Sequence, residues 1–443
     1  MGKIITPENC VDIPLTQDQE DKLGKLLKWY KSSGDPVITL AGFAGTGKTT
    51  LMAFFRNSLK NRLKVNFCAY TGKARTVLQD KLVKVSHEND QFMTLHKLMY
   101  RPEIDLDGKL TGWIPTSENI ENCDLIVIDE GSMVTSEINR EIMRRNSKAK
   151  ILVLGDHGQL GPIGTRFNWM EKPDLILTEI HRQALDSPII QLSIRAREGK
   201  HIDIMRYSND VVVSSDFDDF SGDMLNRDML DDSFIITDTN NRRVGINKWM
   251  RNSLYSYNDN FPRKGDKVIC LKNNDNHLPP IYNGLITKVL SSETDGEHTY
   301  KIKVDRSDWP DGTEDEYYVS KYLFNNPSGK IPDHKIKEIG GWYGVGDLFD
   351  FGYAITCHKS QGSESGSVFI FGDGRVFNRG ADGNLQQKRW NYTAITRSKK
   401  KLYIYREPTS KQFSMSTNGN DNDKPRCSGM GLNNSYEGKT FSW

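Results

Sequence analysis

The sequence predicts an α/β fold of parallel sheets covered by helices on both faces, interrupted by two insertions of mainly β structure. Short apolar segments alternate with helical segments in the first part of the chain, and the segments lie at residues 37–40, 65–70, 125–129 and 151–155. Such continuous apolar runs are typical of strands buried on both faces. The same alternation returns from about Ile189. From Gly265 the pattern changes to short β-like runs separated by turn residues.

The length and composition limit the class of protein. A chain of 443 residues is too long for one ordinary domain and suggests two to four. Lys and Arg number 60 and Asp and Glu 58, a formal net charge of +2. This excludes a histone-like or basic-tail protein, although a local basic groove stays possible. The 36% of apolar and 10% of aromatic residues argue against a largely disordered chain.

The sequence shows neither a recognisable targeting signal nor the cysteine spacing of a disulfide-bonded or zinc-binding protein. The first 15 residues lack a cationic segment followed by an apolar run, so we expect no signal peptide. No apolar run approaches the roughly 20 residues that cross a bilayer. The six cysteines include no C-x-x-C pair, which favours reduced thiols over disulfides or a zinc finger. We therefore expect a cytoplasmic protein with no membrane partner.

The first elements lead into a glycine-rich loop. Residues 20–31 place Leu23, Leu26, Leu27 and Tyr30 at helical spacing, which predicts an amphipathic helix. Asp35 and Pro36 end it, and residues 37–40 follow as a short buried strand. Residues 42–47 are rich in glycine, and residues 48–59 read as a helix.

Two segments interrupt the α/β alternation. Residues 103–113 have a turn signal at Asp107-Gly108 between two short segments in which apolar and polar residues alternate, which predicts a β-hairpin. Residues 208–232 contain eight Asp and one Arg, which we interpret as a solvated loop and helix face unsuited to phosphate contacts. A strand at 234–237 and a helix at 243–254 then resume the α/β pattern.

The last part of the chain contains a β insertion and a polar tail. Short β-like runs at 267–271, 285–290, 300–304 and 316–319 predict a small, barrel-like insertion, from which residues 305–347 form a further excursion. The α/β pattern resumes near Tyr353 and closes with a strand at 401–405. The tail, 407–443, is rich in Ser, Asn, Gly and Asp, so we expect a mobile appendage. Its Phe441 and Trp443 are either a docking handle or simply an end.

The strongest motif is a phosphate-binding loop. Gly42-Phe-Ala-Gly-Thr-Gly47-Lys48-Thr49 matches G-x-x-x-x-G-K-[ST] in full, between a predicted strand and helix. Its backbone N–H groups wrap phosphate oxygens, and the helix N-terminus adds partial positive charge. Lys48 is expected to reach the β- and γ-phosphates, and the Thr49 hydroxyl to ligate Mg²⁺. The expected nucleotide contacts are Gly42, Gly45, Thr46, Gly47, Lys48, Thr49 and Thr50.

An acidic pair follows a second buried strand. Asp129 and Glu130 end the apolar run 125–128. We expect Asp129 to hold Mg²⁺ and Glu130 to act as the base or water-positioning group in γ-phosphate hydrolysis. An acidic pair at a strand end is common, but after a phosphate loop in the same sheet it indicates a nucleoside triphosphatase. Gln159, in Gly155-Asp156-His-Gly-Gln159, ends another strand and is expected to sense the γ-phosphate.

The motifs, taken in order, resemble the superfamily 1 helicases, and most closely the RecD-like branch that includes the phage Dda helicases. The resemblance covers about residues 15–405. The matching segments are Leu15-Thr-Gln-Asp-Gln19, Tyr70-Thr71-Gly-Lys73, Thr94-Leu-His96, Asp129-Glu-Gly-Ser132, Gly155 to Ile163, Leu177-Thr-Glu-Ile-His-Arg182, Tyr353 to Glu364 and Tyr392-Thr-Ala-Ile-Thr396-Arg397. Tyr70 departs from the branch, which commonly has proline there.

The resemblance assigns further nucleotide contacts. It implies that Gln19 reads the adenine, that Gly362 and Glu364 approach the nucleotide, and that Arg182 and Arg397 are arginine fingers. Taken alone, each arginine fits a surface or structural ion pair somewhat better, and the ordered set of motifs favours the finger. If both come from a second domain, catalysis requires the two domains to close, because a finger can contribute roughly 10³ to 10⁵ in rate.

The expected ligand polymer is single-stranded DNA. A protein that binds it without sequence preference needs contacts to the DNA backbone and side chains on which bases stack. The matched motifs imply DNA contacts by Thr71, Lys73, Thr94, His96, Thr356 and His358. Phe92 and Trp113 are candidates for base stacking, but either is about as plausible in the core. His96 alone would be a structural histidine, and its Thr-x-His-x-Leu context favours the DNA role.

The resemblance also implies a domain organisation. We expect two RecA-like domains, at 1–98 with 119–187 and at 188–262 with 350–406. A strand-separating pin at 99–118 interrupts the first, an SH3-like insertion at 263–349 interrupts the second, and the tail is 407–443.

The implied activity is ATP- and Mg²⁺-dependent unwinding of DNA in replication, recombination or repair. The resemblance implies 5′→3′ movement by a monomer on single-stranded and forked DNA. The tail is a candidate docking segment for a single-strand-binding or replisome protein.

Two other functions stay open. A translocase that displaces proteins without much unwinding would carry the same motor motifs. A non-motor module using ATP as a switch fits less well, because Glu130, Arg182 and Arg397 are all present. A small-molecule kinase is excluded, because its single domain would leave the chain beyond Ile189 unexplained.

Overall fold

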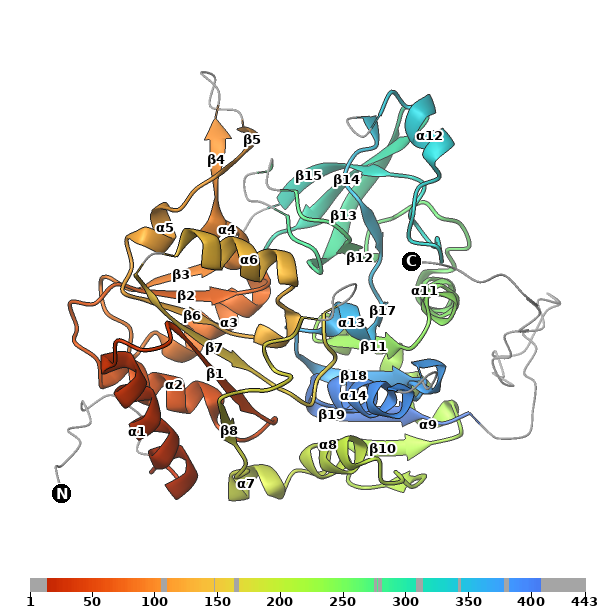
Figure 1. Ribbon diagram of the computed structural model, residues 1–443. Helices are drawn as coiled ribbons and strands as arrows, with labels where there is room; N and C mark the ends of the chain where they lie inside the picture. The colour runs from red at the N-terminus through yellow and green to blue at the C-terminus, as the bar shows by residue number, and fades with distance from the viewer. Residues whose placement is uncertain are drawn as a thin grey trace.

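The structure is a computed structural model that describes residues 14–104, 110–146, 148–162, 167–274, 277, 281–307, 314–341, 344–377 and 382–407. Within these ranges the chain forms two six-stranded sheets, a five-stranded sheet and a two-stranded hairpin (Figure 1). The predicted α/β fold class is confirmed. The hairpin turn at 105–109 and the tail beyond residue 407, with Phe441 and Trp443, lie outside the described residues.

The first sheet is fully parallel, in the strand order β3-β2-β6-β7-β1-β8. Its strands are β1 (Val37–Gly42), β2 (Val65–Ala69), β3 (Gln91–Thr94), β6 (Leu125–Ile128), β7 (Lys150–Gly155) and β8 (Leu175–Leu177). All four residues of β6 and all five of β2 are buried, because apolar clusters cover both faces of the sheet. The carboxyl ends of these strands meet at one edge, where ligands bind in open α/β sheets.

Eight helical segments accompany this sheet in the described part of the chain. They are α1 (Gln17–Lys31), α2 (Lys48–Asn57), α3 (Gly72–Leu82), α4 (Leu95–Met99), α5 (Glu118–Glu121), η1 (Gly131–Met133), α6 (Ser136–Arg145) and α7 (Arg182–Leu185). Helix α1 begins three residues before its predicted start. Thr16 and Gln19 form a reciprocal capping box there, which satisfies two otherwise unpaired N–H groups.

The second sheet has the order β17-β11-β18-β19-β10-β9 and is parallel except for the edge strand β9. Its strands are β9 (Met205–Arg206), β10 (Val211–Ser214), β11 (Ser233–Thr237), β17 (Ala354–Thr356), β18 (Ser365–Phe371) and β19 (Ser398–Tyr405). Its helical segments are α8 (Pro188–Glu198), α9 (Asp218–Met224), α10 (Arg227–Leu230), α11 (Asn240–Tyr255), α13 (Cys357–Ser360), η3 (Arg375–Phe377) and α14 (Gly383–Ile395).

The Asp-rich segment 208–232 differs from its predicted character. It contains the fully buried strand β10, and Phe220 and Met224 of α9 enter the hydrophobic core. The interpretation as a solvated loop and helix face therefore holds for the exposed Asp218 and Asp219 of α9 and is wrong for β10. Seven of the eight aspartates are exposed while the valines of β10 pair with β19, and the high Asp count conceals this short apolar run.

The third sheet is antiparallel, with the order β15-β14-β13-β12-β16. It consists of β12 (Lys267–Cys270), β13 (Ile286–Asp295), β14 (Thr299–Asp305), β15 (Glu314–Ser320) and β16 (Phe349–Phe351), with helix α12 (Asp333–Glu338) after β15. Because β15 pairs with β14 along its whole length, residues 314–320 belong to this sheet. The predicted excursion at 305–347 is to this extent wrong.

The second and third sheets share one hydrophobic core. We call the first sheet with its helices the first layer and the second sheet with its helices the second layer. Val212 and Ile246 of the second layer lie in the same buried cluster as Val268, Ile302 and Tyr317 of the third sheet. Strand β16 also leads almost directly into β17, so the two sheets are joined by chain as well as by packing. This shared core fixes the five-stranded sheet to the second α/β layer.

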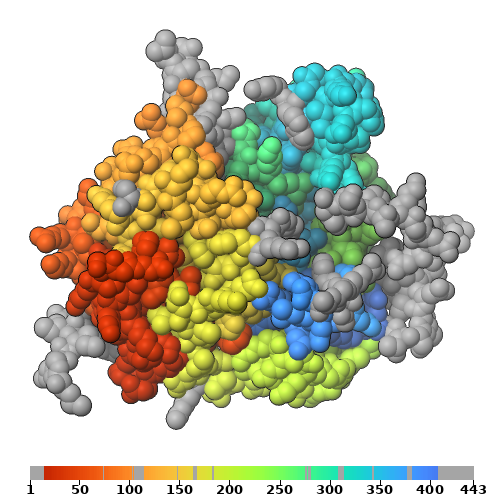
Figure 2. Space-filling view, viewed as in Figure 1, coloured from red at the N-terminus to blue at the C-terminus, as the bar shows by residue number. Residues whose placement is uncertain are grey.

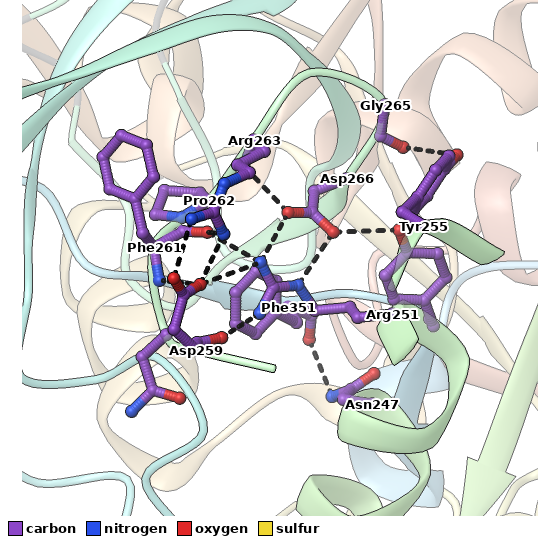
Figure 3. A network of polar contacts seen from close by, with 12 residues as sticks. Asn247, Arg251, Tyr255, Asp259, Phe261, Pro262, Arg263, Gly265, Asp266 and Phe351 are labelled. Carbon is purple, nitrogen blue, oxygen red and sulfur yellow. Dashed lines mark hydrogen bonds and ion pairs between the residues drawn. The ribbon is translucent and has the colours of Figure 1, made fainter. Parts of the chain in front are cut away.

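A buried polar network reinforces that junction (Figure 3). Arg251 of α11 is 1% exposed, and its Nε and Nη2 each donate to the carboxylate of Asp266 at 2.9 Å. The guanidinium also donates to the carbonyls of Asp259 and Phe261 and lies 3.8 Å from the ring centre of Phe351. The network therefore links helix α11 to the start of β12 and the end of β16, which lie together at one end of this antiparallel pair.

The hairpin consists of β4 (Tyr100–Ile104) and β5 (Leu110–Pro115), which pair antiparallel. It rises from the first α/β layer on the same side of the molecule as the third sheet (Figures 1 and 2). No helix among the described residues is long and apolar enough to span a membrane.

Candidate active site

The phosphate loop joins β1 to α2 at the carboxyl edge of the first sheet. Gly45 and Gly47 have φ angles of +81° and +76°, a backbone region that side chains rarely adopt. A Cβ at Gly47 would also lie 2.4 Å from the Nε2 atom of Gln19. Lys48 Nζ folds back over the loop and donates to the carbonyls of Gly42 and Phe43, at 2.6 and 3.2 Å.

The acidic pair follows β6 at the same edge. Glu130 has a φ of +56°, an uncommon conformation for a residue with a side chain and one often found at functional sites. Burial raises the pKa of Asp129, while the Glu130 N–H and Lys48 oppose that rise. Burial also raises the pKa of Glu130 to about 7, against the charge of Arg397. A carboxyl with this pKa gains and loses its proton near neutral pH.

Arg397 comes from the second sheet and reaches the same place. It follows helix α14, is 3% exposed, and donates to the carbonyls of Thr393 and Ser363 at 3.1 and 3.3 Å. No ion pair in the described part of the chain involves this guanidinium. Its Nη2 also donates to the Thr396 hydroxyl at 3.3 Å. A buried cation whose partners are all uncharged is a suitable partner for an anionic ligand.

One cavity of about 470 Å³ collects these groups. Its lining includes Gly45, Gly47, Lys48, Thr49, Thr50, Asp129, Glu130 and Gln159 from the first layer, and Glu364, Thr396 and Arg397 from the second. Gln159 is buried, and its Oε1 has no hydrogen-bond partner in the described part of the chain. The cavity therefore brings cations, carboxylates and an amide oxygen without a partner among the described residues together from two sheets.

The donor set fits a magnesium ion bound together with phosphates. Thr49 and Asp129 offer hydroxyl and carboxylate oxygens on one cavity wall. No group of three or more His, Cys, Asp or Glu side chains that could hold a metal occurs among the described residues. Magnesium is commonly held by one or two carboxylates with substrate phosphates rather than by a full protein cage. Such an ion would neutralise charge on the phosphates.

Four predicted nucleotide contacts are not among the cavity lining. Gly42 and Thr46 lie within the loop, where the Thr46 hydroxyl donates to the carbonyl of Phe43 at 2.9 Å. Gln19 is buried, and its Nε2 donates to the Thr46 carbonyl at 3.1 Å and lies 3.0 Å from His181 Nε2. A Cβ at Gly362 would lie 3.7 Å from Thr71 Oγ1 and 3.5 Å from Met133 Sδ, outside the cavity. For Gly362 the structure favours a place beside the predicted DNA contacts.

The predicted DNA residues are brought together only in part. Thr71 and His358 line a second, small cavity with Tyr282 and Lys359. Thr94 caps helix α4, and the His96 ring stacks on Tyr100 at 4.7 Å. Thr356 precedes helix α13. The small cavity thus joins elements of all three sheets.

Phe92 has a partner inside the protein. Its ring stacks on Phe67 with 5.0 Å between ring centres and packs against the core of the first layer. This contact favours the core alternative over base stacking. Lys73 lies in α3, Trp113 in β5 and Arg182 at the start of α7, but their side chains are outside the described parts.

Sequence reasoning missed several residues of the site. Tyr392 and Asp156 meet beside the phosphate loop, where the Tyr392 hydroxyl donates to Asp156 Oδ2 at 2.5 Å. His181 lies against Gln19 and the loop. All three fall inside motif segments that the sequence displays, so the signal was present, but only the fold shows which of these side chains point toward the loop.

Comparison with known families divides the chain into two matched parts. Residues 14–215 match the family model described as AAA domain, and residues 351–405 match the UvrD-like helicase C-terminal domain. The first match contains the phosphate loop, and the second contains Arg397.

Curated relatives extend the similarity. RecD2, an ATP-dependent DNA helicase of Deinococcus radiodurans, is 24% identical over 415 residues, covering 88% of this chain and 48% of that protein. The RecD subunit of the RecBCD enzyme of Buchnera aphidicola (Acyrthosiphon pisum strain) is 25% identical, covering 83% of this chain and 69% of RecD. The mimivirus protein R530 is 32% identical over 163 residues, with 33% of each chain covered. The chain thus spans half or less of most of these relatives.

A solved structure of Bacteroides Pif1 helicase with ADP-AlF3 and ssDNA covers 90% of this chain and 94% of its own, with a TM-score of 0.49 and 18% identity. That likeness is too distant to assign a role to any residue. The two family matches and the RecD relatives instead span the ordered motifs of both α/β layers. The chain is therefore related to the RecD-like branch of the superfamily 1 helicases.

Proposed function

We propose that this protein is an ATP-dependent DNA helicase that moves 5′→3′ along single-stranded DNA and unwinds duplexes in replication, recombination or repair. One observation carries the proposal: Lys48 and Glu130 of the first layer and Arg397 of the second line one cavity. Hydrolysis in such a cavity depends on the approach of the two layers. The relatives named as helicases supply the link from ATP to DNA.

The proposed mechanism uses this chain's own side chains in succession. Lys48 and the loop N–H groups bind the β- and γ-phosphates, and Thr49 and Asp129 would hold Mg²⁺. Glu130 accepts the proton of the attacking water, and Gln159 orients the γ-phosphate. Arg397 stabilises the negative charge that spreads over the transferred group, a role in which Arg182 is the proposed second finger.

Movement would follow from the same geometry. The second cavity lies where Thr71 of the first layer, His358 of the second and Tyr282 of the third sheet's segment meet. DNA held there would be gripped by both layers, so closure and opening around the nucleotide would shift it along. We propose the domain boundaries given above for these layers, a working monomer, and 407–443 as the docking segment for a replication partner.

The test measures ATP hydrolysis with and without single-stranded DNA, and strand displacement on duplexes bearing only a 5′ or only a 3′ tail. Strong stimulation with unwinding from the 5′ tail alone is the expected result. Unwinding from the 3′ tail would contradict the polarity. Stimulation without displacement would favour the protein-displacing translocase, and ATPase that ignores DNA would favour the switch.

The pH dependence of hydrolysis tests the role of Glu130. Because burial raises its pKa to about 7, the carboxylate that acts as base is lost as the pH falls through that value. We expect kcat/KM for ATP to fall about tenfold per pH unit below 7. Glu130→Gln should lower the rate by about 10² to 10⁴ and flatten the profile. Melting temperatures at each pH control for unfolding, and a parental profile that is flat through pH 7 would contradict the assignment.

The hairpin is the proposed strand-separating pin. Replacing residues 104–112 with a short Gly/Ser turn should abolish unwinding of a forked duplex, because the wedge between the strands is removed. ATPase stimulated by single-stranded DNA should stay at the parental level, since the cavity residues are untouched. Unwinding at the parental rate would show that β4–β5 does not separate the strands.

A further inference from the structure

Tyr392 of α14 joins the two α/β layers through its hydroxyl. The Ala44 N–H of the phosphate loop donates to the Tyr392 Oη at 2.8 Å, and that hydroxyl donates to Asp156 Oδ2 at 2.5 Å. Tyr392 is 0% and Asp156 2% exposed, so water does not compete for either bond. A single side chain of the second layer thus holds two segments of the first layer's site.

Phe43 of the phosphate loop is enclosed from both layers. Its ring centre lies 4.1 Å from that of His157 and 5.9 Å from that of Tyr392, with the Tyr392 ring nearly perpendicular. From α8, the Arg197 guanidinium lies 3.6 Å from the Phe43 ring centre. A Cβ at Gly158 would lie 2.9 Å from the Phe43 ring. The loop after β7 is therefore pressed against the phosphate loop and against α14.

Two more side chains of the second layer hold residues 156–160. The Leu160 N–H donates to Thr393 Oγ1 at 3.0 Å, and Gln361 Nε2 donates to the Leu160 carbonyl at 2.7 Å. The Gln159 Oε1 between these anchors has no partner among the described residues. The segment that carries the proposed γ-phosphate sensor is thus fastened at both ends to the second layer, by Tyr392 at Asp156 and by Thr393 and Gln361 at Leu160.

We infer that Tyr392 is a positioning residue for ATP hydrolysis, which sets the phosphate loop and residues 156–160 in register with Arg397. Arg397 lies five residues beyond Tyr392, just past the end of α14. The hydroxyl therefore fixes the distance between the arginine and the phosphate loop. This inference rests on the proposed function and adds a residue that touches neither nucleotide nor DNA. A group of this kind changes turnover rather than nucleotide affinity.

The test is Tyr392→Phe in the full chain, which keeps the ring and removes both hydrogen bonds. We expect kcat for ATP with single-stranded DNA to fall about tenfold or more, with the Kd for ATP within about twofold of the parent. Tyr403→Phe is the matched control, since the buried Tyr403 hydroxyl also bonds an aspartate, Asp223, outside the cavity. Its kcat should equal that of the parent.

A double-variant cycle separates positioning from simple destabilisation. Because Tyr392 acts through Gln159 and Arg397, the effect of Tyr392→Phe combined with Gln159→Ala should be smaller than the product of the single effects. Hydrogen exchange in the nucleotide-free protein should speed up at residues 156–160 and 43–45 in Tyr392→Phe and not in Tyr403→Phe.

The outcomes distinguish the inference from the proposed function. A parental ATPase that ignores DNA would overturn the motor proposal, yet the exchange comparison would still test Tyr392. Unchanged kcat in Tyr392→Phe, or exchange at residues 156–160 that matches the parent, would overturn the inference while leaving the motor intact. Fully multiplicative effects in the double variant would also overturn it.

Discussion

Arg397→Ala should lower the DNA-stimulated kcat for ATP by about 10³-fold or more. Its guanidinium is the buried cation that the second layer supplies to the cavity, and a finger of this kind contributes roughly 10³ to 10⁵ to phosphoryl transfer. Two carbonyls and the Thr396 hydroxyl, all uncharged, hold it in place, so its charge is available to the ligand. Steady-state ATPase with saturating single-stranded DNA measures the effect.

Charge and geometry can be separated at this position. Arg397→Lys keeps the charge but loses the planar fork, so we expect it to recover only part of the rate. Lys400→Ala removes an exposed cation three residues away and should match the parent. If Arg397→Ala turned over ATP within about threefold of the parent, the transition-state role assigned to the arginine would be wrong.

Arg251→Ala should destabilise the protein by about 3 to 5 kcal/mol. The substitution leaves the carboxylate of Asp266 buried without its bidentate partner, and the carbonyls of Asp259 and Phe261 lose their donor (Figure 3). Because this network joins α11 to the third sheet, the second and third sheets should lose stability together. Thermal and urea unfolding of the full chain, followed by tryptophan fluorescence and circular dichroism, measure the change.

A neighbouring pair provides the control. Arg263 and Asp259 form a surface ion pair, with side chains 35% and 53% exposed, so Arg263→Ala should cost under about 1 kcal/mol. Arg251→Met with Asp266→Asn removes both buried charges and should cost less than Arg251→Ala alone. Equal losses for Arg251→Ala and Arg263→Ala would show that the buried network does not stabilise this junction.

The local chemistry of the chain could be read directly from its sequence. The glycines and Lys48 of the phosphate loop lie within eight consecutive residues, and the loop geometry requires them wherever the fold places it. The apolar run before Asp129 likewise determines a buried strand. The structure extends helix α1 at its start and places helix α11 at 240–255 rather than 243–254, because side-chain caps at Thr16 and Thr239 fix these ends.

Composition gave the wrong structure where charged, exposed residues and buried residues alternate over a short stretch. The eight aspartates of 208–232 obscured β10, whose valines pair with β19 almost 200 residues later. The β-like run at 316–319 was visible in the sequence, but only its pairing with β14 shows that it belongs to the same sheet rather than to an excursion at 305–347. Phe92 was equally suited to stacking on a base or on Phe67, and only the packing of β2 beside β3 selects the second partner.

The sequence by itself therefore determined the phosphate loop, the acidic pair, the ordered motifs and the α/β class, because each depends on residues close together in the chain. The tertiary structure alone decided that Arg397 shares a cavity with Lys48, that Gly362 lies by Thr71, and that Tyr392 bonds to Ala44 and Asp156. These contacts join residues hundreds of positions apart. They exist only because two sheets place their carboxyl-end loops and helix ends face to face, which no local pattern encodes.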